Sequence, residues 1–98
     1  STAIGGGLVI PHARFSGVTK VRIAVATLAA PLDISSEDGR LVDVVILLVG
    51  PQGDPRQMLR VLARLAHLVR NDDFLDQLRT AENIQDLQST FARMTNLP

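Results

Sequence analysis

The sequence predicts one α/β domain in which helices pack against a mixed β-sheet. The chain has 98 residues, which is enough for a single hydrophobic core. Its first half holds short aliphatic runs separated by Gly and Pro, and its second half holds apolar residues at helical spacing. Strands precede helices instead of alternating with them, which favours a mixed sheet over a regular doubly wound one. We expect about three strands and then three helices within residues 1–98.

The first predicted strand is short and lies close to the N-terminus. Residues 8–10 are aliphatic, and the triplet Gly5-Gly6-Gly7 comes directly before them. Pro11 follows and cannot donate a hydrogen bond to a sheet ladder. We therefore expect the strand to end here and run into a turn.

Two further strands follow before residue 50. Residues 21–28 mix β-branched residues with alanine and lead to Pro31, and residues 35–39 are a cluster of turn formers. Residues 41–49 are almost wholly Val, Leu and Ile. This composition is typical of a strand covered on both faces, so we place it in the middle of the sheet.

The second half of the chain predicts three helices. Asp54 stands at an N-cap position and Pro55 at the first helical position of a helix that reaches about Arg70. A second helix follows Asn71, and a third can be capped by Thr80. The first helix carries a core-facing apolar stripe of Met58, Val61, Leu62, Leu65, Ala66, Leu68 and Val69.

Composition excludes several classes of protein. Ten basic and ten acidic residues cancel, and there are only three aromatic residues, so nucleic-acid binding is not expected. No cysteine is present, which removes disulfides and thiolate metal sites and is compatible with a reducing compartment. The apolar runs are far shorter than the roughly 20 residues that span a bilayer. No secretion signal is recognisable, so we expect a cytoplasmic protein.

His12 is the strongest candidate for chemistry. It follows Pro11 at the end of a predicted strand, where a stiff backbone can hold a side chain that still reaches solvent. A neutral imidazole is nucleophilic near neutral pH, which phosphoryl capture requires. The alternative is a histidine that only hydrogen-bonds a loop carbonyl. His67 is interpreted as a partly exposed residue of the long helix, and no spacing of ligands predicts a metal site.

Other polar residues allow two interpretations. Ser1 and Thr2 can hydrogen-bond phosphate oxygens or can simply form a turn, and Arg14 can add charge-assisted contacts or stay solvated. The glycine triplet matches no nucleotide-binding motif, so no cofactor is expected. A ridge of arginines on the long helix is either a solvated face or a docking site for an acidic partner; its members are Arg56, Arg60 and Arg64.

The segment STAIGGGLVIPHAR, residues 1–14, resembles the phosphorylation segment of type-2 enzyme IIA domains of the bacterial phosphotransferase system. These domains form the fructose, mannitol and nitrogen-regulatory group. The resemblance covers essentially the whole chain and continues through these stretches: residues 31–32, Gly39, residues 42–45, residues 62–66, Phe74, Leu78 and Ala81.

The resemblance implies a IIA-like sandwich fold and a phosphohistidine carrier, formally a transferase. In such a carrier His12 takes a phosphoryl group from the phosphocarrier protein HPr and passes it to a IIB domain, or signals by its phosphorylation state. It also implies that Ser1, Thr2 and Arg14 lie in the segment that contacts the phosphate. Neither a cofactor nor insertion into the membrane is implied.

Two departures from the family pattern bear on function. Met58 stands where much of the family has a second histidine, and an arginine that the family carries shortly before the Ser-Thr pair would fall before Ser1. The family's domains are longer at the N-terminus, so we expect residues 1–98 to be one such domain without its N-terminal part. The alternative to a phosphocarrier is a regulatory protein-binding module with weak or no phosphotransfer; a purely structural domain ranks last.

Overall fold

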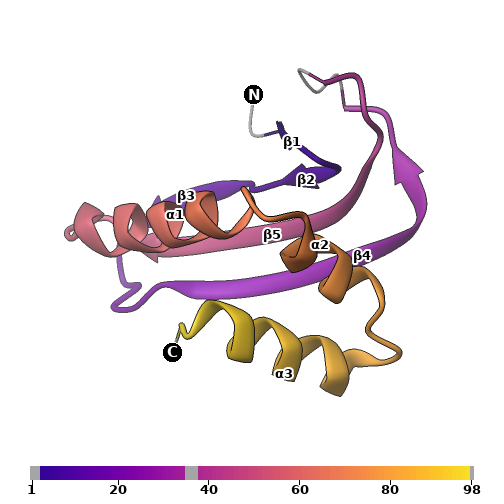
Figure 1. Cartoon of the computed structure of the whole chain (residues 1–98). Helices are drawn as coiled ribbons and strands as arrows, with labels where there is room; N and C mark the ends of the chain where they lie inside the picture. The colour runs from indigo at the N-terminus through magenta and orange to yellow at the C-terminus, as the bar shows by residue number, and fades with distance from the viewer. Residues whose placement is uncertain (1–2, 35–37, 98) are drawn as a thin grey trace.

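The computed structural model describes residues 3–34 and 38–97. Strands come first and helices last, as predicted (Figure 1). The strands are β1 (Ala3–Gly5), β2 (Leu8–Val9), β3 (His12–Phe15), β4 (Arg22–Leu32) and β5 (Val42–Pro51). The helices are α1 (Pro55–Leu68), α2 (Asp72–Arg79) and α3 (Ile84–Thr95).

β5 is the central strand of a mixed sheet. Both β2 and β3 pair with it in parallel along one edge, and β4 pairs with it antiparallel along the other. β1 adds an antiparallel neighbour to β2. The predicted mixed sheet and the central place of this strand are therefore confirmed.

β2 ends before Pro11, as predicted, but β3 begins at His12 along the same edge of β5 in place of the expected turn. Val9 lies opposite Val45 and His12 opposite Leu48, so the register along β5 is the same on both sides of the proline. The Pro11 carbonyl still accepts a hydrogen bond from the Leu48 amide at 2.9 Å. A proline removes only one donor from the ladder, which an edge strand tolerates. The structure has five described strands where the sequence predicted about three, because β1 and β3 were not expected.

The prediction that β5 is covered on both faces is wrong. Its side chains alternate between buried and partly exposed, and Leu47 is 42% exposed while Leu48 is fully buried. The buried face packs against residues of all three helices. The core residues are Leu8, Ile10, Val44, Ile46, Leu48, Met58, Val61, Leu65, Phe74, Leu75, Leu78 and Phe91.

The residues that cap the helices differ from the predicted ones in two respects. Asp54 precedes α1 as predicted, but its carboxylate accepts from Gln57 Nε2 and not from the helix backbone. Asn71 caps α2 as predicted, by accepting from the Asp73 amide. α3 is capped by Asn83, because Thr80 ends α2 and its hydroxyl donates to the Gln77 carbonyl.

Leu65 should contribute far more to stability than Leu59, although both are leucines of α1. Leu65 is 0% exposed and Leu59 is 64% exposed. Leu65→Ala should lower the free energy of unfolding by about 2–5 kcal/mol, because it opens a cavity in the core. Leu59→Ala should change that free energy by less than about 0.5 kcal/mol. Urea denaturation followed by circular dichroism measures both, and equal losses would contradict this packing.

Candidate functional site

His12 begins β3 on an edge of the sheet. It lies opposite Leu48 of β5, and parallel partners point to the same face, so its side chain is on the face that carries α1. Unlike Leu48, which is covered, His12 is exposed. His12 thus presents its imidazole to solvent from a backbone that is hydrogen-bonded to β5.

A backbone carbonyl fixes the tautomer of this imidazole. His12 Nδ1 lies 2.8 Å from the Ile10 carbonyl oxygen. A carbonyl only accepts, so Nδ1 must hold the hydrogen, and the lone pair of the neutral ring is on Nε2. The Ile10 carbonyl is available because the Pro11 carbonyl faces β5, and successive residues of a strand alternate in direction. The hydrogen bond to a carbonyl, which the sequence analysis gave as the alternative role of His12, is present, and it leaves the lone pair on Nε2.

Arg14 lies near His12 on the same strand face. It is two residues further along β3, which corresponds to roughly 6.6 Å between Cα atoms. Its exposed guanidinium makes one long contact, with Nη1 3.5 Å from the Gln52 carbonyl. Such a side chain is free to meet a charged group on His12. Ser1 and Thr2, the other predicted phosphate contacts, lie outside the described residues.

Met58 is buried, with its side chain directed at the sheet. It is 4% exposed, and its terminal methyl carbon lies only 2.8 Å from where a Cβ on Gly50 would be. Gly50 is the register partner of Arg14, so this contact is next to the strand of His12. A thioether has no N–H to donate and holds no proton at neutral pH. Met58 therefore fills space where a histidine would offer hydrogen bonds.

The glycine turn before β2 is held by a charged clasp that the sequence analysis missed. Arg79 Nε and Nη2 each donate to the Asp43 carboxylate at 2.9 Å, and Nη2 also donates to the Gly6 carbonyl. The backbone amides of Asp43 and Val44 both donate to the Gly7 carbonyl. Gly7 has φ of +86°, and a Cβ there would lie 2.6 Å from Arg79 Nη2. Only glycine fits this position.

The pKa of Arg79 is consistent with its pairing to Asp43. The hydrogen bond to Asp43 is the main cause that raises the pKa of Arg79, while partial burial opposes the shift. Arg79 thus keeps its charge at all practical pH values. One signal in the sequence pointed to this pair, since Asp43 is the one charged residue in an otherwise aliphatic strand.

His67 lies on α1 and is exposed, as predicted. In the described ranges 3–34 and 38–97, no group of three or more His, Asp or Glu side chains is placed to hold a metal ion. None of the helices in those ranges is both long enough and apolar enough to cross a membrane.

Residues 1–94 match the family described as "Phosphoenolpyruvate-dependent sugar phosphotransferase system, EIIA 2". This chain belongs to that family. The match includes the glycine turn, His12, Met58 and the Asp43–Arg79 clasp. The family resemblance inferred from residues 1–14 is confirmed.

The names of similar proteins describe different roles. A "Nitrogen regulatory protein" of Bradyrhizobium diazoefficiens is 38% identical over 94% of this chain and 60% of its own length. A "PTS system fructose-specific EIIA component" of Haloferax volcanii is 27% identical over 96% of this chain and 61% of its own length. The crystal structure of nitrogen regulatory protein IIA-Ntr from Neisseria meningitidis has a TM-score of 0.83 and 26% identity, covering 93% of this chain and 62% of that one. This chain thus spans about three-fifths of the length of these EIIA proteins.

Removing the guanidinium of Arg79 should loosen the glycine turn. Arg79→Ala leaves Asp43 largely buried without its partner, at 28% side-chain exposure, and should lower the free energy of unfolding by about 1–3 kcal/mol. Arg79→Lys should fall between wild type and Arg79→Ala, since an ammonium cannot form the same fork. Arg70→Ala, an exposed arginine just after α1, is the control and should be near neutral. Equal urea midpoints for Arg79→Ala and Arg70→Ala would show that the clasp contributes nothing.

Proposed function

We propose that this chain carries a phosphoryl group on His12, accepting it from HPr and passing it to a IIB domain or a regulated target. The observation that carries the proposal is the hydrogen bond from His12 Nδ1 to the Ile10 carbonyl. In a member of the EIIA type-2 family, that bond leaves one exposed imidazole nitrogen with a free lone pair.

The proposed step needs no proton to leave the accepting nitrogen. The lone pair of His12 Nε2 attacks phosphorus on the phosphohistidine of HPr, and the donor's N–P bond breaks in line as the new N–P bond forms. The donor imidazole leaves with the electron pair of the broken bond. The His12 ring becomes positively charged, and its Nδ1–H, held 2.8 Å from the Ile10 carbonyl, stabilises that charge. Positioning and charge neutralisation supply most of the catalysis in such transfers.

Arg14 is the described residue best placed to neutralise the transferred group. It lies on the same strand face as His12, and among the described residues its guanidinium makes only the long contact to Gln52. In this proposal Ser1 and Thr2 add hydroxyl contacts to the phosphoryl oxygens. Residues 1–98 act as one domain, which the single core supports. A cytoplasmic location belongs to the proposal, and the absence of cysteine is compatible with it.

A regulatory binding module with weak or no phosphotransfer is the second candidate. Met58 favours it, because its buried thioether offers no hydrogen bond to a phosphorylated ring. The nitrogen regulatory protein of Bradyrhizobium diazoefficiens, at 38% identity, is compatible with a role in signalling. Both candidates use the same fold, and they differ in whether His12 becomes phosphorylated.

Incubation with enzyme I, HPr and phosphoenolpyruvate, followed by intact mass measurement under alkaline conditions, tests the first candidate. Wild type should gain the mass of one phosphoryl group. His12→Ala should lose the gain entirely, because it removes the accepting nitrogen, while His67→Ala should keep it. His67 is the matched control, since it is the only other histidine in the chain.

If wild type gains no mass while HPr is shown to be phosphorylated, the carrier proposal is wrong. The regulatory module would then be the better account of this chain. A gain that persists in His12→Ala would place the phosphoryl group on another residue.

A further inference from the structure

The exposed side of α1 is basic and has no acidic residue to balance it. The helix has 14 residues and contains three arginines and one histidine, but no Asp or Glu. Arg56 and Arg60 are both exposed. Arg64 differs from them, because its Nε donates to the Thr95 carbonyl at 2.9 Å and so anchors the end of α3.

Arg56 and Arg60 are unfavourably placed for stability. Arg56 is in the first turn of α1, where the helix dipole disfavours cations, and Arg60 is four residues further on, where like charges repel. Across residues 3–34 and 38–97, neither Arg56 nor Arg60 forms an ion pair. Residues that are unfavourable for the local structure and have no compensating contact often lie at functional sites.

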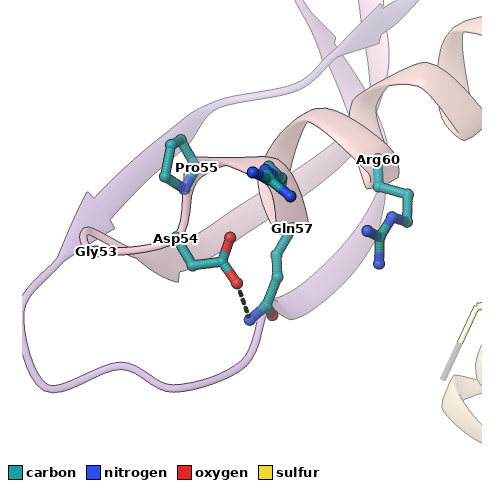
Figure 2. A pocket seen from close by; sticks show the side chains of 6 residues that line it. Gly53, Asp54, Pro55, Gln57 and Arg60 are labelled. Atoms are coloured by element: carbon teal, nitrogen blue, oxygen red, sulfur yellow. Dashed lines mark hydrogen bonds between the residues drawn. The ribbon is translucent and has the colours of Figure 1, made fainter.

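Arg60 borders a preformed groove. It encloses about 700 Å³ between α1, the residues that lead into β4, and the end of the chain. Its apolar lining is Val21, Ile23, Val61 and Leu97, and Lys20 and Arg60 add positive charge. A second hollow shares Gln57 and Arg60 with the groove and adds Arg56 (Figure 2).

Gln57 keeps the groove in shape. Its Oε1 accepts from the Val21 amide, and its Nε2 donates to the Thr19 carbonyl and to Asp54. Figure 2 shows Gln57 and Arg60 extending from the same side of α1, with Asp54 turned toward Gln57. The Asp54 carboxylate, which lines the second hollow, thus accepts from Gln57 and forms no ion pair with Arg56 or Arg60 across the described residues.

We propose that this groove docks an acidic amphipathic segment of a partner protein. Aliphatic side chains of the segment fill the apolar floor, and its carboxylates pair with Arg56, Arg60 and Lys20. A phosphate or a nucleic-acid backbone would use the cations but not the floor, and the groove has no aromatic side chain on which a base could stack.

This surface is separate from the His12 edge. The groove borders β4, whereas His12 lies on β3, and these strands are on opposite edges of β5. The proposal does not depend on phosphotransfer.

A pair of synthetic peptides tests the proposal. One capped peptide has glutamates flanking leucines at helical spacing, and the other has every glutamate replaced by glutamine. Titration of the ¹⁵N-labelled chain should give amide shifts centred on Val21, Gln57 and Leu97 with the acidic peptide, and affinity at least about tenfold weaker with the neutral one. Arg60→Glu should weaken binding of the acidic peptide by about tenfold or more, and Arg70→Glu, an equal change in charge, by less than about twofold.

Folding of the variant is checked by its urea midpoint. Arg60→Glu relieves the repulsion from Arg56, so its midpoint should equal or exceed that of wild type. Lost affinity with retained stability supports the docking groove. The proposal is overturned by no binding of the acidic peptide, by equal affinity of the two peptides, by equal effects of the two variants, or by shifts centred on His12. Tighter binding of a deoxythymidine decamer than of the acidic peptide would also overturn it.

Discussion

The pairing of β5 along both of its edges is the constraint on which the rest of this structure depends. β4 occupies one edge, and β2 and β3 share the other in a single register that continues past Pro11. One face of β5 supplies buried residues to the core, against which all three helices pack. A change in register by one residue would turn this buried face to solvent, so core packing and strand pairing enforce each other.

The position of His12 follows from that register. Because the strand continues, the Pro11 carbonyl stays on β5, and the Ile10 carbonyl is left to bind the imidazole. Upstream, the Asp43–Arg79 clasp fixes the glycine turn from which β2 begins, and it links β5 to the end of α2. The His12 side chain is thus held by a backbone carbonyl, and the glycine turn by the Asp43–Arg79 clasp. A phosphoryl carrier needs this kind of rigid placement, since its chemistry is mainly positioning.

Local signals in the sequence predicted most helices and strands. The features that were not predicted depend on contacts between residues far apart in the chain. Asp54, Pro55 and the apolar spacing of residues 58–69 were enough to predict α1, and the aliphatic run was enough to predict a central strand. The turn expected after Pro11 was wrong, because β3 resumes the register of β2 on an edge that only the pairing with β5 creates. The clasp joins residues 36 apart in the chain, so the lone charge of Asp43 in its strand gave a signal, but no local pattern identified Arg79 as its partner. Residues 1–14 predicted His12 as the site, and the hydrogen bond that selects Nε2 became visible only in the folded strand.

Direct observation of the His12 tautomer tests the central claim, that a strand-edge carbonyl leaves Nε2 as the accepting atom. Long-range ¹H–¹⁵N correlation of the imidazole, recorded where the ring is neutral, distinguishes the two nitrogens, and His12→Ala assigns the signals against those of His67. The account predicts a protonated Nδ1 and an unprotonated Nε2 in His12. A protonated Nε2 with a bare Nδ1 would mean that the Ile10 carbonyl does not hold the ring, and the proposed accepting nitrogen would be wrong.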